Sequence, residues 1–555
     1  MRGNGGSRLD AAAASRMEAR KGREMSMSGS EDGGPPSEHG RTPDAVRPRV
    51  TARRLLAVLL ALAWLHGSLY AGLMPPWGLI DEAQHVDYIQ SLAEGRGQPI
   101  VGETYLSPEI IDSHFATRRW ETFLWTAPAT ADPAAMGLAA HSYEAYQPPL
   151  FYWLMTPIYW ALPGDILDKL FGLRWVMVTL SLIPVWVVFW LARRLRPDDL
   201  RFAGFATLLY ISLPERTMAV SRVNNDVLLE IWAALALMVL TVGAAQGMTR
   251  RDSLLLGVLI GAGVWTKASA VFLLGAAALV LWQQPRAAAR ALIARTGVVV
   301  TVLGMAALIR NLALYGDATG FAGFRAVHDV PFTPGPLTEL PLGLATAIHH
   351  TFLVWWKGSD AATNPLVTGF YWLMTLVVVA AVVQAARRAR GATGRVLLVY
   401  GAVVALYLTA TLASYYAAMI PVTQGRFLLP AMAALALLMA WGLWEASPWA
   451  VVGVTGVLAA MDAISLFGNL LPFHYYWSGI VTGKIPAGLP LMGRVAATVG
   501  RLLADKPGWV AAVIPALPVL YALGWVAALA AVARLRNPAR SALTHAVDAP
   551  LSLRV

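Results

Sequence analysis

Long apolar stretches separated by short polar or basic connections dominate the chain from residue 55 onward. Most of them approach the roughly 20 residues that an α-helix needs to cross the hydrocarbon core of a bilayer. We therefore predict an all-α polytopic membrane protein with about twelve transmembrane helices, within a range of 11–13. The predicted crossings are 55–74, 172–192, 202–219, 227–246, 253–266, 268–284, 296–313, 366–386, 396–419, 428–446, 449–468 and 511–533.

The apolar segment 148–163, "PPLFYWLMTPIYWALP", is short and contains four prolines. Arginine-rich connections such as "ARRLRPDDLR" (192–201) and "ARRARGATGR" (386–395) should remain in the cytoplasm. If 148–163 crossed the membrane, those connections would lie outside. We therefore predict that it is an interfacial or re-entrant helix on the outer side. This orientation places both termini in the cytoplasm and the protein in the plasma membrane.

The predicted organisation has one main transmembrane domain between two polar tails. The first 50 residues are rich in Gly, Ser, Pro and charge and lack apolar periodicity, which is typical of disorder. The expected parts are a disordered cytoplasmic tail (1–50), the main transmembrane domain (51–468) with external loops at 75–171 and 314–365, a third external loop with the last crossing (469–534), and a cytoplasmic tail (535–555).

Composition supports the membrane class and excludes several chemistries. Hydrophobic residues make up 57% of the chain and charged residues 14%, against about a quarter in soluble domains. The absence of cysteine excludes disulfides, thiolate nucleophiles, iron–sulfur clusters and cysteine-based zinc sites. The net charge of +11 reflects arginine in cytoplasmic loops, so nucleic acid is not expected as a partner.

The predicted orientation collects the unusual polar residues on the outer face. Because it was derived only from loop charge and segment length, this convergence predicts a site at the boundary between membrane and exterior. The residues are Asp81, Glu82 and His85 after the first crossing, Gln147 before the interfacial helix, Arg174 at the second crossing, Arg222, Asn225 and Asp226 between the third and fourth, Lys267 between the fifth and sixth, and Arg426 before the tenth.

These residue types suit transfer from a lipid-linked phosphate donor. Lys267 offers a compact charge and Arg426 a planar fork, and both bind phosphate well. A neighbouring carboxylate can accept a proton from the acceptor as the new bond forms. Nucleotide sugars are cytoplasmic, so an external sugar donor should be linked to a lipid. No glycine-rich phosphate loop with a Walker lysine appears in the sequence.

Other interpretations of the same residues remain open. Asp81, Glu82 and His85 contain metal-ligand types but lack the two-histidine spacing of HExxH, so a divalent metal is not favoured and no cofactor is expected. Lys267 and Arg426 can also reach lipid headgroups. The pair Asn225 and Asp226 can cap a helix, and Tyr152 can belong to an interfacial aromatic belt.

Two non-enzymatic functions compete with transfer chemistry. A transporter or flippase for a polyprenyl-linked or other anionic lipid would have charges in the middle of its crossings, and Asp462 is the principal one here. An envelope assembly protein would bind cell-envelope polymers with its external loops. That function gives no reason for gathering Asp81, Lys267 and Arg426 on one face.

Five short motifs, taken in order, resemble the C-type (GT-C) glycosyltransferases over residues 55–430. They are "LIDEAQHVDYIQSLAEGRGQPI", "YQPPLFYWL", "NND", "GAGVWTKASAVFLL" and "QGRFLLP". The branch they resemble comprises bacterial relatives of protein O-mannosyltransferases and aminoarabinose (lipid A) transferases. The resemblance implies a GT-C-like bundle, a polyprenyl- or dolichyl-phosphate sugar donor and inversion at the sugar carbon.

The resemblance also implies roles for particular residues. Asp81 in the first external loop becomes the general base, with Glu82 beside it in the catalytic pair. Lys267, Arg426 and Arg174 become ligands of the donor phosphate. On the substrate side we expect His85, Gln147, Tyr152, Arg222, Asn225 and Asp226.

One motif departs from the family pattern. The His-Pro-Pro sequence of the O-mannosyltransferases appears here as Gln147-Pro148-Pro149. The sugar therefore stays open, and the acceptor can be a glycan, a lipid or a protein.

Overall fold

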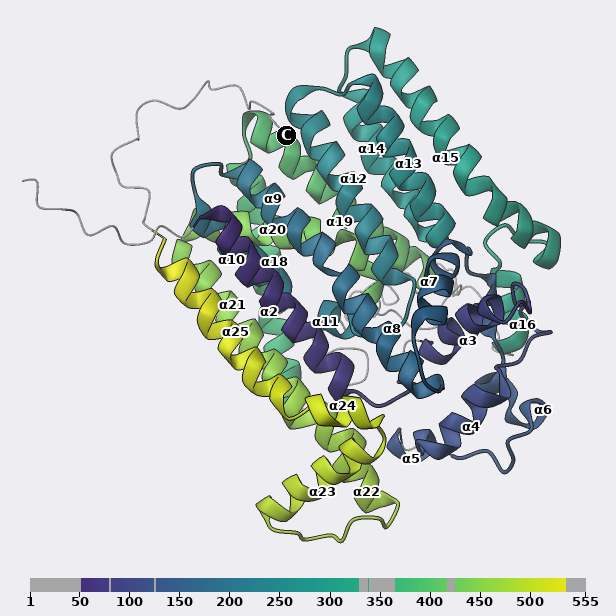
Figure 1. Cartoon of the computed structure of the whole chain (residues 1–555). Coiled ribbons are helices and arrows are strands. Elements are labelled where there is room, and N and C mark those ends of the chain that lie inside the picture. The colour runs from purple at the N-terminus through teal and green to yellow at the C-terminus, as the bar shows by residue number, and fades with distance from the viewer. Residues whose placement is uncertain are drawn as a thin grey trace, which may run out of the picture. The chain divides into compact units, whose positions relative to one another are not determined.

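The computed structural model describes residues 51–78, 81–123, 126–328, 338, 365–416 and 425–535, and these residues form helices joined by turns (Figure 1). Within those ranges, the β-structure is a single antiparallel bridge between Tyr105 and His141. The predicted tail at 1–50 and most of the tail at 535–555 lie outside the described residues, as does most of the loop at 314–365.

A helix occupies each predicted crossing. The helices of the apolar bundle are α2 (Ala52–Leu73), α8 (Ile166–Leu180), α9 (Leu182–Leu195), α10 (Leu200–Ile211), α11 (Pro214–Val220), α12 (Asp226–Gln246), α13 (Arg250–Thr266), η3 (Ala268–Phe272), α14 (Leu273–Trp282), α15 (Arg286–Tyr315), α18 (Pro365–Arg388), α19 (Gly391–Tyr416), η5 (Gly425–Leu428), α20 (Leu429–Ala446), α21 (Pro448–Ala463) and α25 (Ala516–Ala533).

Shorter helices connect the long ones at one end of the bundle. They are α3 (Glu82–Ala93), α4 (Pro108–Ala116), α5 (Arg119–Thr122), α6 (Pro133–Met136), η1 (Gly137–Ala140), η2 (Tyr143–Tyr146), α7 (Leu150–Ala161), α16 (Phe321–His328), η6 (Ile464–Leu470), η7 (Pro472–Trp477), α22 (Ser478–Val481), α23 (Leu491–Ala504) and α24 (Gly508–Val513). The predicted interfacial segment 148–163 corresponds to α7.

Eight helical segments among the described residues are long and apolar enough to cross a membrane. Two further apolar helices, Leu200–Ile211 and Ala268–Trp282, are shorter. The all-α polytopic membrane class is therefore confirmed, whereas the exact count of twelve crossings is not.

Two helix boundaries differ from the sequence-based expectation. The segment 202–219, expected as one crossing, is divided into α10 and α11, because Pro214 lacks the N–H that would continue the helix. The segment 449–468, expected to end in an external loop, continues as helix through π-helical turns to Val481. Its apolar run masked the change in helix type, since periodicity does not distinguish α from π turns over a few residues.

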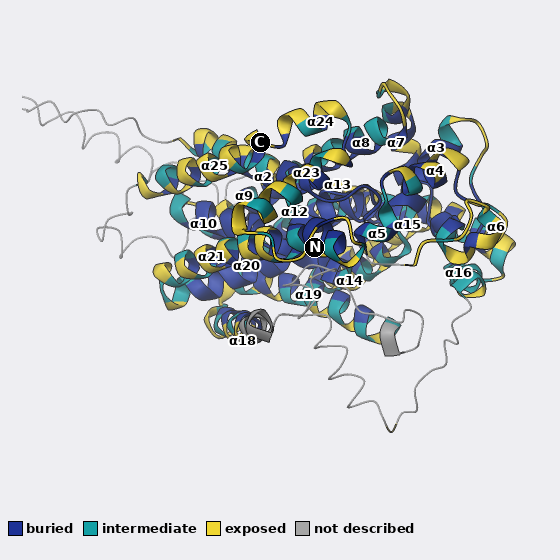
Figure 2. Cartoon of the chain, turned by 90° about the horizontal axis from the view of Figure 1, so that it is seen from below, coloured by how far each residue is buried: buried dark blue, intermediate teal, exposed yellow. Residues whose placement is uncertain are grey.

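Helix α20 lies at the centre of the bundle, where it packs against α10, α12, α18, α19 and α21. In the most apolar stretch of α20, 89% of the residues are buried. The corresponding shares are 28% for α15 and 22% for α25 (Figure 2). Gly442 permits the closest approach, because a Cβ there would lie 1.8 Å from the carbonyl oxygen of Ala381 in α18. The exposed apolar surfaces of α15 and α25 are those that lipid would cover.

Charged side chains on several apolar helices form hydrogen bonds between helices. Asp462 of α21 accepts hydrogen bonds from Tyr70, at 2.7 Å, and shares a 2.7 Å contact with His66, both on α2. Arg216 of α11 donates to Glu230 of α12 at 2.8 Å. Both carboxylate oxygens of Asp462 thus join α2 to α21, and the transport alternative remains untested.

The end of α15 fixes the segment that carries the site. Arg310 donates to the carbonyl oxygens of Pro99 and Ala145, and Asn311 donates to that of Tyr146. Helix α3 packs against α7 and η2 within the same segment. The short helices between α2 and α8 are therefore tied to the bundle by hydrogen bonds from side chains of α15 to backbone carbonyls.

Candidate functional site

Five interhelical connections place polar side chains at one end of the bundle. Asp81 precedes α3, Gln147 precedes α7, Asp226 begins α12, Lys267 follows α13, and Arg426 lies in η5 before α20. Each residue stands where a long apolar helix begins or ends, or in a short segment packed there. The structure therefore brings together residues that are up to 345 positions apart in sequence.

Asp81 adopts the left-handed backbone conformation, with φ 56° and ψ 23°. Asp and Asn tolerate this region better than other side chains, and such strain concentrates at functional sites. Its two oxygens accept hydrogen bonds from Tyr143 Oη at 2.8 Å and from Arg426 Nη2 at 2.7 Å. Burial alone would raise the pKa of Asp81, but the charge and hydrogen bond of Arg426 outweigh it and lower the pKa to about 2.

Lys267 forms the second ion pair of the site. Its Nζ lies 2.6 Å from Oδ1 of Asp226. The neighbouring Asn225 donates to the carbonyl oxygen of Thr266 and to Oε1 of Gln147, each at 3.2 Å. The bonds of Asn225 connect the start of α12, the end of α13 and the start of α7, next to the Lys267–Asp226 ion pair.

Glu144 is a site residue that the sequence analysis did not single out. It lies in η2, and its Oε2 accepts a 2.8 Å hydrogen bond from Gln147. Burial and the negative charge of Asp81 raise the pKa of Glu144 to about 7, against the opposing effect of Lys267. The sequence feature that points to Glu144 is its position three residues before Gln147, because residues three apart in a 3₁₀ turn share a face.

Glu82 and Arg174 bind each other and are fully buried. The guanidinium donates to both carboxylate oxygens of Glu82, at 2.8 and 2.6 Å. It also donates to the carbonyl oxygens of Ala71, Met74 and Pro75 at the end of α2. This geometry fastens α3 and α8 to α2, and the expected catalytic role of Glu82 and phosphate-binding role of Arg174 remain predictions.

His85, Tyr152 and Arg222 are also buried. His85 Nδ1 and Tyr152 Oη share a 2.9 Å hydrogen bond, and Tyr152 stacks on Tyr88 with ring centroids 3.7 Å apart. Burial lowers the pKa of His85 to about 3, so its ring is neutral at physiological pH. Arg222 lies against Gly78, where a Cβ would come within 3.5 Å of its Cζ. Their expected roles toward substrate remain predictions.

The part of the chain that the structure describes contains no cluster of three or more His, Asp or Glu side chains that could bind a metal ion. Asp81 contacts Arg426, Glu82 contacts Arg174, and His85 contacts Tyr152. The three side chains thus take separate partners, and a metal requirement stays untested.

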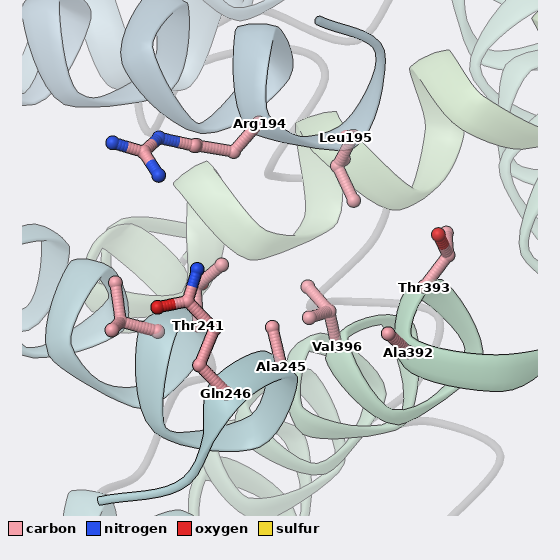
Figure 3. A pocket seen from close by; sticks show the side chains of 9 residues that line it. Arg194, Leu195, Thr241, Ala245, Gln246, Ala392, Thr393 and Val396 are labelled. Atoms are coloured by element: carbon pink, nitrogen blue, oxygen red, sulfur yellow. The ribbon is translucent and has the colours of Figure 1, made fainter. Parts of the chain in front are cut away.

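A small cavity of about 40 Å³ lies at the opposite end of the bundle (Figure 3). It is lined by Arg194, Gln246 and Thr393, among others. Gln246 ends the 21-residue α12, which Asp226 begins, and a helix of that length spans about 30 Å. A cavity of this size holds only a few waters, so it is not the candidate site.

Comparison with known proteins supports the predicted resemblance. Residues 146–312 match the sequence profile of the family described as dolichyl-phosphate-mannose-protein mannosyltransferase. The match includes Gln147, Asn225, Asp226 and Lys267 and confirms the GT-C resemblance over this segment. Comparison with curated proteins finds no match.

Two solved structures are similar to this chain. One is ArnT from Cupriavidus metallidurans bound to undecaprenyl phosphate, with a TM-score of 0.46 and 14% identity over 87% of this chain and 74% of that chain. The other is the archaeal oligosaccharyltransferase AglB from Archaeoglobus fulgidus, in complex with an inhibitory peptide and a dolichol-phosphate. Its TM-score is 0.40, with 15% identity over 85% of this chain and 56% of that chain.

Proposed function

We propose that this protein is an integral-membrane glycosyltransferase that moves a sugar from a polyprenyl-phosphate donor to an acceptor on the outer face of the membrane. The observation that carries the proposal is the cluster of Asp81, Arg426, Lys267 and Asp226 at one end of an apolar helical bundle. The family match over residues 146–312 supports the class of reaction.

The donor phosphate would bind between Lys267 and Arg426. Each cation forms an ion pair with one carboxylate, Lys267 with Asp226 and Arg426 with Asp81. The side chains of Lys267 and Arg426 are 18% and 9% exposed, so both are partly accessible. An anionic phosphate can bind between the two cations because Lys and Arg both form charge-assisted hydrogen bonds with phosphate oxygens.

Asp81 would act as the general base. The acceptor oxygen or nitrogen attacks the anomeric carbon, the bond from that carbon to the phosphate oxygen breaks, and the acceptor proton passes to Asp81. This single displacement inverts the anomeric carbon. The departing phosphate gains negative charge, which Lys267 and Arg426 stabilise.

Donor binding would also prepare the base. Arg426 is the main group that lowers the pKa of Asp81. When Arg426 turns to the phosphate, Asp81 loses part of that stabilisation and becomes more basic, while Tyr143 still holds one of its oxygens. Binding of the anionic donor and activation of the base are thereby coupled through one arginine.

The proposal is tested by measuring transfer from purified polyprenyl-phosphate sugars, both hexosyl and pentosyl, to glycan, lipid and peptide acceptors. Asp81→Asn should lower the rate by about 10²–10⁴-fold, the range for loss of a general base. Glu103→Gln, an exposed carboxylate of the same segment, is the matched control and should retain the native rate. Undiminished transfer by Asp81→Asn would remove Asp81 from the mechanism.

A further inference from the structure

Helix α23 presents an apolar face away from the protein. Leu491, Met492, Val495 and Val499 are 73%, 76%, 49% and 43% exposed. Their spacing of one, four and eight positions from Leu491 places them on one side of the helix. Single exposed apolar residues are common on protein surfaces, whereas a contiguous apolar stripe indicates an interaction surface.

The C-terminal end of the same helix packs against the protein, where Leu502 is 4% exposed, and the exposed apolar residues lie outside that contact. Arg501 is 8% exposed, and its Nη2 lies 3.5 Å from Oγ of Ser478 in α22. Asp505, which ends α23, accepts a 2.9 Å hydrogen bond from Arg118. A helix that rests on a protein surface in water turns its apolar residues inward. The apolar face of α23 therefore requires a cover other than water.

The surroundings of α23 identify that cover. The chain enters this segment from the candidate span Pro448–Val481 and leaves it for the candidate span Ala516–Ala533. Exposed tryptophans, Trp477 and Trp509, stand at the two ends of the segment, as is typical of residues at a membrane interface. Arg494 supplies an exposed positive charge within α23 itself, where it can meet anionic headgroups.

We propose that α23 lies in the membrane interface, with Leu491, Met492, Val495 and Val499 inserted at the boundary between headgroups and acyl chains. The partner is a phospholipid surface. A second copy of the chain would also cover apolar residues, but Val481 and α25 also expose apolar side chains, and they belong to the candidate spans that precede and follow α23 in the sequence. The position of α23 in the chain, between two candidate spans, favours lipid.

This placement links the lipid surface to the candidate site. Lys506, just after α23, donates a 2.9 Å hydrogen bond to the carbonyl oxygen of Met74 at the end of α2. Arg174 donates to the same carbonyl, and Asp81 follows seven positions later. Through Lys506 and the Arg118–Asp505 pair, α23 braces the connection that carries Asp81 and sets its height relative to the headgroups.

The chain has no cysteine, so single-cysteine variants of the full protein report one position each. Met492→Cys and Val495→Cys, with Glu103→Cys as an exposed polar control, are labelled with an environment-sensitive fluorophore. The labelled proteins are placed in nanodiscs of phosphatidylcholine and phosphatidylglycerol. We expect blue-shifted emission at positions 492 and 495, with quenching by nitroxide-labelled lipids several-fold stronger than at position 103.

Two results would overturn the proposal. Strong quenching of both α23 positions by aqueous iodide would show that the face lies in water. Protection from iodide together with protection from lipid nitroxides would show that a protein, such as a second copy of the chain, covers it. Because the labelled side chains are exposed and outside the site, neither variant depends on glycosyl transfer, and loss of the proposed function leaves this test unaffected.

Discussion

Asp81 combines an uncommon backbone conformation with two strong hydrogen-bond partners. Asn shares the tolerance of Asp for the left-handed region, so Asp81→Asn should fold with little added strain. It removes the negative charge and leaves Arg426 without its partner. A loss of transfer in this variant therefore reports on the carboxylate and its cation rather than on a collapsed α2–α3 connection.

Glu144 should make donor binding depend on pH near neutrality. Its pKa, raised to about 7 by burial and Asp81, means that it is protonated below that pH and ionised above it. A polyprenyl-phosphate sugar is a phosphodiester whose charge is constant in this range. We expect its Kd to rise several-fold from about pH 6 to about pH 8, because ionised Glu144 adds repulsion, and Glu144→Gln should flatten this dependence. Titration calorimetry in detergent measures both.

The pKa values of other groups near Glu144 distinguish their titration from that of Glu144. The pKa of Asp81 is lowered to about 2 and that of His85 to about 3, so neither titrates near neutral pH. Burial raises the pKa of Asp87 to about 6, which makes Asp87→Asn the informative control. If the pH dependence survives in Glu144→Gln and disappears in Asp87→Asn, the assignment to Glu144 is wrong.

The residue scale also shows what a sequence can and cannot reveal about a site. Asp81, Lys267 and Arg426 could be placed at one end of the bundle because each flanks a long apolar run. Their partners could not, since the Asp81–Arg426 pair spans 345 positions and depends on how the helices pack. Glu82 and Arg174 were placed on the same side, but the sequence did not show that they bind each other and are fully buried.

At the scale of elements, the Glu82–Arg174 pair fastens α3 and α8 to the end of α2. Arg174→Met should leave Glu82 buried without a counter-charge and lower the free energy of unfolding by about 3–5 kcal/mol. Thermal unfolding in detergent should show a lower Tm for this variant. The double variant Glu82→Gln/Arg174→Met should recover part of the loss, because it buries no unpaired charge.

The same variants decide whether Arg174 binds phosphate. A structural role predicts that the folded fraction of Arg174→Met binds the donor with native affinity. An unchanged Tm combined with a weaker donor affinity would instead support the phosphate role that the sequence resemblance implied.

Element boundaries were predictable where composition changes abruptly and unpredictable where it does not. Helix α13 begins at a capping box, in which Thr249 and Asp252 exchange side-chain and backbone hydrogen bonds, close to the predicted start at 253. Pro214 divides the predicted third crossing inside an apolar run. The helix that begins at Pro448 continues to Val481, beyond residue 468, where an external loop was expected to begin.

For the whole molecule, sidedness is the property on which the proposed chemistry depends. The site residues lie at one end of the bundle, and the arginine-rich connection at 192–201 lies beside the small cavity at the other end. If arginine-rich connections remain in the cytoplasm, Asp81 faces outward, toward the supply of lipid-linked sugars. A site facing the cytoplasm could use nucleotide sugars directly and would not need a donor linked to a polyprenyl lipid.

Impermeant maleimide labelling of intact cells tests this orientation in the cysteine-free chain. Glu103→Cys reports the end that carries the site, and Asp198→Cys reports the basic end; both positions are exposed. We expect position 103 to react in intact cells and position 198 to react only after permeabilisation, because the two positions belong to opposite ends of helices that span the bilayer. The reverse pattern would place Lys267, Arg426 and Asp81 in the cytoplasm and would overturn both the orientation and the proposed external transfer. A cytosolic protein with an accessible cysteine is the control for membrane integrity, and it must stay unlabelled until the cells are permeabilised.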